Sequence, residues 1–213
     1  MKPPRISIIV LTCNGKDHLE ECLSSLLKQT YSRLEVVLVI NGSRDGSASF
    51  VRDTFGDRIR LIELPENIGY TGGNNAGLRE AQGEYIAFLN DDTRVDPEWA
   101  EEMLGVFERR PDCGMTACKI VSYYNPRIID NVGHLIYRDG TFRGRGRLEK
   151  DRGQYDRVEE VLAPSGCAFM VRKKILDRVG GFDDDFFIYC YYADLSLRIR
   201  LAIRESAHRP REE

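Results

Sequence analysis

Apolar and polar positions along the chain are grouped in blocks the size of strands and helices. Apolar runs over 5–11, 34–40 and 85–89 predict three buried strands. Segment 17–29 predicts an amphipathic helix, because its apolar positions share one helical face: Leu19, Cys22, Leu23, Leu26 and Leu27. A strand, a helix and a strand in succession form a βαβ unit, whose sheet is parallel. The sequence therefore predicts an α/β protein.

The rest of the chain continues this alternation less regularly. The pattern predicts helices over 47–55, 76–81 and 98–109 and strands over 58–63 and 115–121, and it predicts that segment 161–171 is a loop that enters a buried strand. Segment 65–77 is rich in glycine and asparagine, and we expect a loop whose backbone approaches a ligand closely. Segment 125–156 is polar and predicts a solvated loop; the alternative is that its arginines, Arg143, Arg145 and Arg147, grip a phosphate.

Composition and charge restrict the classes of partner. With 213 residues, of which 42% are hydrophobic and 31% charged, the chain can bury one sizeable core. The formal net charge of −3 gives no general attraction to nucleic acid. The apolar runs are too short to span a membrane and the first residues lack a secretory signal pattern, so we expect a cytoplasmic protein. The six cysteines are scattered singly, which favours reduced thiols over disulfides.

Candidate chemistry is concentrated where the predicted strands end. Asp91 and Asp92 follow Asn90 at the end of the third apolar run, and the first two runs end at Thr12 and Asn41. In an open α/β sheet ligands bind outside the carboxyl ends of the strands. Paired carboxylates there suit Mg²⁺ or Mn²⁺, which prefer oxygen ligands shared with substrate phosphates. The alternative is a turn that leads into the N-terminus of the next helix.

Five segments together carry a family resemblance, in the family's order: 9–15, 41–47, 67–77, 83–93 and 180–183. They resemble the family 2 glycosyltransferases, with Asn41-Gly42-Ser43-Arg44-Asp45-Gly46-Ser47 and Asn90-Asp91-Asp92 among the matching motifs, and most closely the rhamnosyltransferase-like branch. The resemblance implies a GT-A fold, a UDP- or dTDP-sugar donor, a divalent metal (Mg²⁺ or Mn²⁺), and transfer with inversion at the anomeric carbon.

The resemblance also implies roles for individual residues. Asn90-Asp91-Asp92 falls on the family's Asp-x-Asp motif, so Asp92 is expected to ligate the metal, and Asn90 and Asp91 to lie against the donor. Thr12, Asn14 and Asn41 match positions around the nucleotide. Further donor contacts are expected from Asn74 and Asn75, and Ser165-Gly166 is expected near the donor sugar and the acceptor.

The chain departs from the family pattern where the general base is expected. The usual Glu-Asp pair falls on Tyr191-Tyr192, and a phenol with a reference pKa of about 10 is a poor base at neutral pH. Asp194 is the nearest carboxylate and our candidate catalytic residue, although it also suits the start of a helix. Ile40 replaces an Asp that usually contacts the base of the nucleotide, and His208 comes too early for the His that often completes the metal site.

We therefore predict a single GT-A domain over residues 1–213. Its nucleotide-sugar-binding half is 1–97, and its acceptor half, 98–213, looks shortened. The expected function is transfer of a sugar, in cell wall or polysaccharide biosynthesis, to a glycan or lipid-linked acceptor, which leaves peripheral association with the inner face of a membrane open. The alternative is an inactive nucleotide-sugar-binding paralogue. A nucleotidyltransferase is disfavoured because no basic triphosphate loop follows the first strand.

Overall fold

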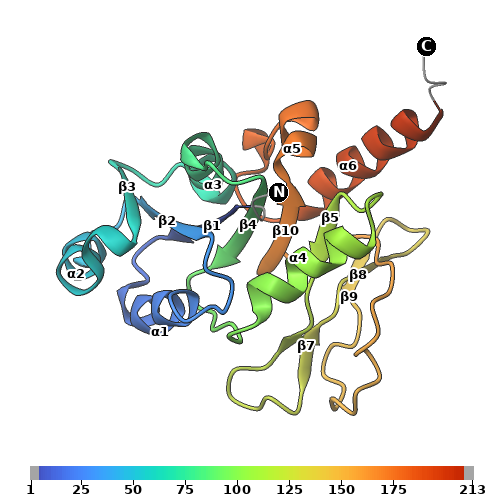
Figure 1. Cartoon of the computed structure of the whole chain (residues 1–213), viewed down its shortest axis with the longest axis horizontal. Coiled ribbons are helices and arrows are strands. Elements are labelled where there is room, and N and C mark those ends of the chain that lie inside the picture. The colour runs from blue at the N-terminus through green and yellow to red at the C-terminus, as the bar shows by residue number, and fades with distance from the viewer. Residues whose placement is uncertain (1–4, 209–213) are drawn as a thin grey trace.

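A six-stranded sheet forms the centre of the molecule (Figure 1). The computed structural model describes residues 5–208, and side chains as far as Ile203. The strand order is β3-β2-β1-β4-β10-β5. The strands are β1 (Ile6–Thr12), β2 (Leu34–Asn41), β3 (Arg60–Leu64), β4 (Tyr85–Asn90), β5 (Met115–Ala117) and β10 (Ala168–Arg172). The pairs β3–β2, β2–β1 and β1–β4 are parallel, as predicted, whereas β10 is antiparallel to both of its neighbours.

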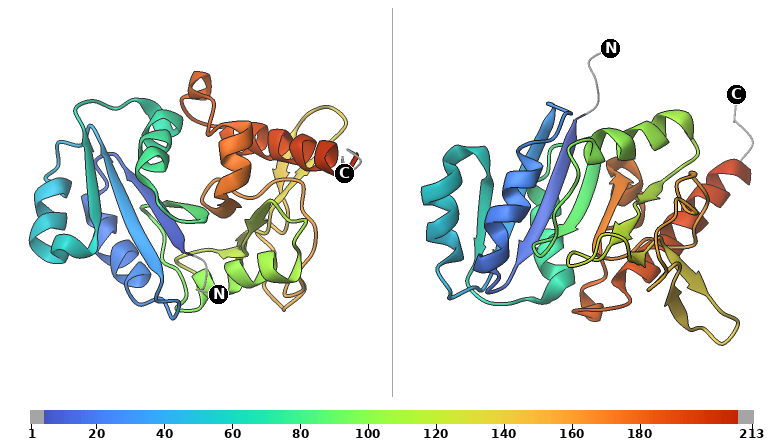
Figure 2. Two further views of the ribbon diagram at one scale, coloured as in Figure 1. Left: turned by 45° about the horizontal axis from the view of Figure 1, so that its top comes forward. Right: turned by 90° about the horizontal axis from the view of Figure 1, so that it is seen from below.

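Helices cover both faces of the sheet (Figure 2). One face packs against α1 (Lys16–Leu26), α2 (Ser47–Phe55) and α4 (Trp99–Arg109), and the other against α3 (Gly69–Glu80), α5 (Lys173–Val179) and α6 (Tyr191–His208). Alternate residues of a strand point to opposite faces, so Ile8 joins the first core and Ile9 the second. Each such side chain, when fully buried, contributes about 1.5–3 kcal/mol of transfer free energy. The α/β fold is confirmed.

The glycine- and asparagine-rich segment is helical, which corrects the predicted loop over 65–77. Helix α3 begins at Gly69, seven residues before the predicted start at Ala76. A Cβ at Gly77 would lie 2.6 Å from Ile9 Cγ2, and one at Gly73 would lie 2.4 Å from Leu11 Cδ1. The glycines therefore let the helix pack closely against β1, and this packing outweighs their poor helix propensity.

The polar region after β5 contains short strand pairs rather than one loop. The predicted strand 115–121 is interrupted, with β6 (Ile120–Val121) paired to β7 (Ile129–Asn131), and β8 (His134–Ile136) and β9 (Phe142–Gly144) form a hairpin. Short 3₁₀ turns cover Gly56–Arg58 and Asp184–Phe186. The three arginines singled out in the sequence have intramolecular partners: Arg145 pairs with Glu159, Arg147 with Asp130, and Arg143 lies over the Tyr137 ring.

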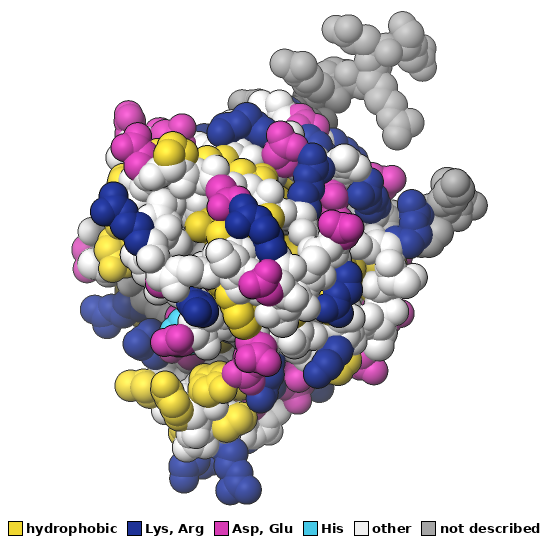
Figure 3. All heavy atoms as spheres, turned by 90° about the vertical axis from the view of Figure 1, so that its left-hand side faces the viewer, with side chains coloured by type: hydrophobic (Ala, Val, Ile, Leu, Met, Phe, Trp, Pro, Cys, Tyr) yellow, Lys and Arg dark blue, Asp and Glu magenta, His cyan; other side chains and the backbone are white. Residues whose placement is uncertain are grey.

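The surface carries mixed charges. On the face in Figure 3, Lys and Arg side chains are interspersed with Asp and Glu, with no large area of one sign. No helix within residues 5–208 is both long and apolar enough to cross a membrane. The six cysteines are all free.

Candidate active site

The carboxyl ends of the parallel strands meet at one edge of the sheet. In register, Leu11 of β1 lies opposite Asn90 of β4, and Thr12 lies opposite Ile40 of β2. The backbone N–H of Asn90 donates to the carbonyl of Cys167, at 2.9 Å, just before β10 begins. The fold thus brings the Asn90-Asp91-Asp92 turn beside the end of β1 and the segment that leads into β10.

The loops after β1 and β2 are joined by hydrogen bonds between side chains of one loop and backbone groups of the other. Asn14, which has a left-handed backbone (φ 57°), donates its N–H to Ser43 Oγ at 2.9 Å, and its Oδ1 accepts from Arg44 N–H at 2.8 Å. Asp45 Oδ2 accepts from the N–H of Lys16 at 2.9 Å. These bonds join the two loops into one surface, called the shelf below, which includes Asn14, Ser43 and Asp45. Because Asn14 Oδ1 is already engaged, its role at a nucleotide would be to shape this shelf.

Asp91 and Asp92 occupy different environments at the same turn. Asp92 is exposed, whereas Asp91 is half-buried between Thr12 and Gly15; a Cβ at Gly15 would lie 2.1 Å from Asp91 Oδ2. Burial raises the pKa of Asp91, and the neighbouring charge of Asp92 adds to this effect, while the Thr12 hydroxyl opposes it. Thr12 Oγ1 is buried beside this carboxylate and makes no hydrogen bond of ordinary geometry, so Asp91 is its polar neighbour at this turn.

The carboxylates of this turn suit a divalent cation that takes most of its oxygen ligands from a diphosphate. Within residues 5–208, no group of three or more His, Cys, Asp or Glu side chains could hold a metal by itself. Mg²⁺ is commonly bound by one or two carboxylates together with substrate phosphates and water. The exposed carboxylate of Asp92, with Asp91 beside it, provides such a partial site.

The raised pKa of Asp91 gives a prediction on stability. The pKa of Asp91 is higher in the folded state than in the unfolded state. The protonated carboxyl therefore stabilises the native state at a pH below the unfolded pKa, and this stabilisation is lost as the pH rises through the folded pKa. Asp91→Asn should therefore raise the melting temperature at pH 7 relative to the parent, with a smaller difference at pH 4. Calorimetric melting of both proteins at these two pH values checks this. A variant less stable than the parent at pH 7 would contradict it.

Asn41 is buried and holds the segment before α3. Its exposed fraction is 2%. Its Nδ2 donates to Asn67 Oδ1 and to the carbonyl of Gly69, both at 2.9 Å, and its Oδ1 accepts from the N–H of Ile68 at 3.0 Å. The polar atoms of this side chain are therefore engaged in holding segment 67–69.

Asn74 and Asn75 also make internal hydrogen bonds. Asn74 is buried and donates to the carbonyl of Tyr70 at 2.9 Å, and its Oδ1 has no hydrogen-bond partner. The Asn75 amide donates to Phe182 O at 2.8 Å and Asp184 Oδ1 at 2.7 Å, and accepts from Phe182 N–H at 2.9 Å. Asn75 thus fixes the segment after α5, while Asn74 Oδ1 and Thr71 Oγ1, three residues apart on α3, are both buried without a hydrogen-bond partner.

A tyrosine pair lies against the expected donor-sugar position. Tyr70 stacks on Tyr191 with ring centroids 4.2 Å apart. The Tyr70 hydroxyl donates to the Gly166 carbonyl at 3.1 Å and lies 3.4 Å from Asn90 Oδ1. A Cβ at Gly166 would lie 2.2 Å from the Tyr191 hydroxyl, so only glycine fits there. Gly166 and Asn90 are therefore joined through Tyr70, with Ser165 one residue away.

Asp194 is held by an arginine on the same helix. Its Oδ2 accepts from Arg198 Nη2 at 2.6 Å and Nε at 2.9 Å. The same guanidinium donates to the carbonyls of Val179 and Gly181, each at 2.9 Å. Asp194 thus lies in the first turn of α6, three residues after the helix begins at Tyr191, and its ion pair with Arg198 helps to join this helix to the end of α5.

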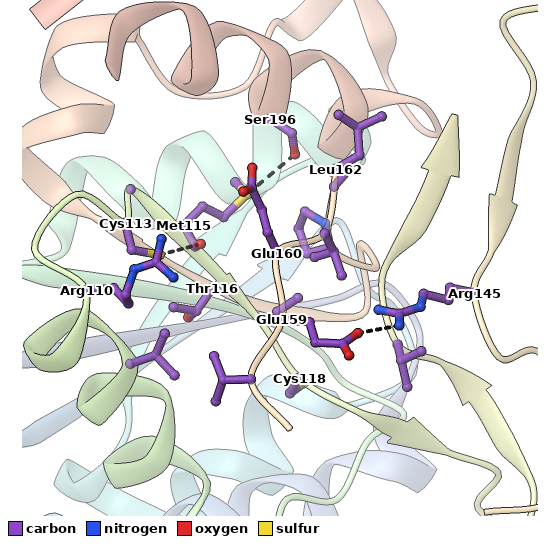
Figure 4. Close-up of a pocket in the computed structure, with 18 of the residues that line it drawn as sticks. Arg110, Cys113, Met115, Thr116, Cys118, Arg145, Glu159, Glu160, Leu162 and Ser196 are labelled. Carbon is purple, nitrogen blue, oxygen red and sulfur yellow. Dashed lines mark hydrogen bonds and ion pairs between the residues drawn. The ribbon is translucent and has the colours of Figure 1, made fainter. Parts of the chain in front are cut away.

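A cavity also lies away from these strand ends. It has a volume of about 440 Å³ and is lined by parts of β5, α6 and segment 156–164, and neither Thr12, Asn41 nor Asp92 lines it. Figure 4 shows Met115 and Ser196 on its wall and the Arg145–Glu159 pair at its side. Its charged lining residues include this pair and the pair of Arg200 with Glu160. This cavity is separate from the strand ends that carry the candidate site.

Two contacts near the candidate site could not be foreseen in the sequence. Tyr70 lies within the matching segment 67–77, but no pattern indicated that its hydroxyl would reach Gly166, which is 96 residues away. His134 lies in the polar region, and its ring stacks on Tyr192 with centroids 4.8 Å apart. Only the fold, which brings β8 next to α6, could reveal this pair.

A comparison with known protein families shows to which family the chain belongs. The model described as "Glycosyl transferase family 2" matches residues 7–180. This chain belongs to that family. The O-antigen biosynthesis protein RfbC of Myxococcus xanthus is 28% identical over 206 residues, which cover 92% of this chain and 16% of that protein.

Solved structures show the same GT-A fold. The mannosyltransferase PcManGT from Pyrobaculum calidifontis, in complex with GDP-Man and Mn²⁺, matches with a TM-score of 0.68 and 23% identity over 93% of this chain and 52% of that chain. TarS 1-349 from S. aureus, in complex with UDP-GlcNAc, matches with a TM-score of 0.64 and 19% identity over 92% of this chain and 53% of that chain. This family 2 chain therefore spans about half the length of these two structures.

Proposed function

We propose that this family 2 domain transfers a sugar, with inversion, from a nucleotide-sugar donor to a glycan or lipid-linked acceptor in polysaccharide biosynthesis. The observation that carries the proposal is the juxtaposition of Asp92, the buried Thr12 hydroxyl and Gly166 at one edge of the sheet. This edge is where open α/β sheets bind ligands. The donors of the structural neighbours, GDP-Man and UDP-GlcNAc, are of the class proposed here.

The residues at this edge suit different parts of a donor. The shelf of Asn14, Ser43 and Asp45 lies where the nucleoside would bind. Asp92, with Asp91 beside it, would hold a divalent metal on the diphosphate. When bound, Mg²⁺ or Mn²⁺ supplies positive charge that offsets the charge developing on the leaving diphosphate. Asn90 and Ser165-Gly166 would flank the sugar, which the resemblance to the rhamnosyltransferase-like branch suggests is a deoxyhexose on UDP or dTDP.

The relative in O-antigen biosynthesis supports a polysaccharide acceptor. A lipid-linked acceptor would require the domain to work beside a membrane on its cytoplasmic side, by peripheral association. The division into a donor half over 1–97 and an acceptor half over 98–213 remains part of the proposal.

A second function is favoured by the residues at the expected base position. Tyr192 is a half-buried phenol, and burial raises its pKa further above the ordinary value, so it stays protonated at neutral pH. Asp194 is paired with Arg198. A domain that binds the donor without transferring the sugar fits these two observations.

Isothermal titration calorimetry with UDP-glucose, UDP-GlcNAc, dTDP-rhamnose and GDP-mannose, each with Mn²⁺ or with EDTA, tests the proposal. At least one donor should bind in the micromolar to millimolar range with Mn²⁺ and more weakly with EDTA. Consumption of that donor, followed by release of nucleoside diphosphate, separates the enzyme from the binding protein. If none of the four donors binds, both functions are contradicted.

A further inference from the structure

Strand β5 is the open edge of the central sheet. Among the described residues it pairs only with β10. The N–H of Arg172 donates to the carbonyl of Gly114 at 3.1 Å, and in an antiparallel pair every second residue is bonded in this way. Thr116 is therefore the next residue bonded to β10. The backbone N–H and C=O groups of Met115 and Ala117 point to the other side, away from the sheet.

The backbone of Ala117 is unpaired on this outer side. Its N–H and its carbonyl have no hydrogen-bond partner within residues 5–208. The Met115 carbonyl accepts from the Cys113 thiol at 3.1 Å. Segment 157–162 lines the same cavity as β5, and no β-bridge joins the two within the described range. An edge with unpaired backbone groups is a template for a further strand.

The cavity of about 440 Å³ lies against this edge, and residues 114–119 all line it. Its walls come from both sides of the sheet, with Val106 from α4 on one side and Ile199 from α6 on the other. Figure 4 shows Met115 and Thr116 of β5 on its wall. The cavity therefore occupies the place that a further strand beside β5 would take.

The size and the lining of the cavity suit a short peptide. A water molecule takes about 30 Å³ of the liquid, so the cavity has room for about 15 groups of that size, or about three residues with small side chains. Strand β5 also has three residues. Apolar lining side chains include Val106, Val161 and Ile199. Most of the charged lining residues pair with one another: Arg110 with Asp112, Lys119 with Asp156, Arg145 with Glu159, and Arg200 with Glu160.

We propose that this cavity binds an extended, neutral peptide segment of a partner protein, which adds to β5 as a further strand of the sheet. A peptide backbone supplies both an acceptor for the N–H of Ala117 and a donor for its carbonyl, whereas a hydrocarbon would leave both groups unpaired. The edge of a second folded copy cannot reach β5, because α4, α6 and segment 155–164 enclose the cavity. The inference is independent of the transferase function and of the donor site.

The blocked peptide acetyl-Val-Ala-Val-methylamide is the probe for this test. We expect it to bind with a dissociation constant in the high micromolar to millimolar range, and to slow hydrogen exchange of the Ala117 amide measured by NMR. The Thr116 amide, already bonded to β10, should change little. Two further probes carry an N-methyl group on the central or on the last residue. Because neighbouring amides of an extended strand point to opposite sides, one of them should bind at least about tenfold more weakly, and the other within about threefold of the parent probe.

Two variants of the protein complete the test. Ala117→Pro removes the outward N–H, and proline is tolerated where an edge strand faces away from its partner. This variant should keep the circular dichroism spectrum of the parent and bind the probe at least about tenfold more weakly. Ala117→Ser keeps the N–H and should bind as the parent does. The inference is overturned if the parent binds no probe, if both methylated probes bind alike, or if Ala117→Pro folds and binds as tightly as the parent. Equal binding of the methylated probes, with displacement by 1-hexanol, would instead indicate a simple apolar cavity.

Discussion

Replacing Asp92 with alanine is expected to weaken Mn²⁺-dependent binding of nucleoside diphosphate by at least about 100-fold. Asp92 is exposed at the end of β4, and in the proposed site it is the first protein ligand of the metal. Among residues 5–208 no cluster of three ligating side chains could take its place. Loss of a group that merely supports a metal ligand already costs about 10- to 100-fold in affinity, so the ligand itself should cost at least the upper value. Calorimetric titration with UDP in Mn²⁺ measures this effect.

Asp96 provides the matched control. It is another exposed aspartate, four residues further along the same loop. Asp96→Ala should bind UDP and Mn²⁺ as the parent does. The free energy of unfolding of both variants should stay within about 0.5 kcal/mol of the parent's, because surface substitutions cost little. Equal affinity of Asp92→Ala and Asp96→Ala would show that the metal is held elsewhere.

Asn41→Ala should reduce the free energy of unfolding by about 2–3 kcal/mol. The alanine leaves the N–H of Ile68 without its partner and removes a second bond to the carbonyl of Gly69, at the point where the chain enters α3. Since a buried polar group left unpaired costs about 1–3 kcal/mol, this is among the largest effects expected from a single polar side chain here. Urea unfolding followed by circular dichroism gives the value.

Asn67→Ala is the comparison for this prediction. Asn67 is exposed and shares one of the bonds of Asn41, so its replacement should cost about 1 kcal/mol or less. Donor affinity should fall in Asn41→Ala, because segment 67–69 is no longer held in place. If Asn41→Ala unfolded at the same urea concentration as the parent with an unchanged slope, the network would be irrelevant to the fold.

The central strands could be predicted because a strand buried on both faces is a continuous apolar run. The predicted strand over 34–40 differs from β2 by a single residue, and β4 was predicted to within one residue. The same reasoning located Thr12, Asn41 and Asn90 at one edge of the sheet. The alternation of strands and helices along the sequence, which implies parallel pairing, was also visible. The first four strands could therefore be predicted from the local sequence.

The first seven residues of helix α3 could not be predicted, because their helical structure depends on distant contacts. Its propensity is poor, and what stabilises it is close packing of Gly73 and Gly77 on Leu11 and Ile9. Strand β5 is short for a comparable reason: its pairing with β10 joins residues about fifty positions apart, and ends at Ala117. Such contacts leave no periodic pattern in the local sequence.

The site residues were named by position, but their contacts depend on the fold. Asn41 and Asn75 were expected at the donor, yet the structure engages their amides with segments 67–69 and 182–184. The sequence carried the residue types and not the partners. His134 and Tyr70 show the converse, since contacts over more than fifty residues place them beside Tyr192 and Gly166.

The position of a bound metal tests the central claim most directly. Crystals of the protein grown with UDP and Mn²⁺ can be measured at a wavelength where manganese scatters anomalously. We predict one anomalous peak within ligand distance of Asp92 Oδ and of the diphosphate oxygens, with the uracil on the shelf formed by Asn14 and Ser43. A peak bound only at other residues, or UDP bound away from the ends of β1 and β4, would contradict the assignment of this edge as the donor site.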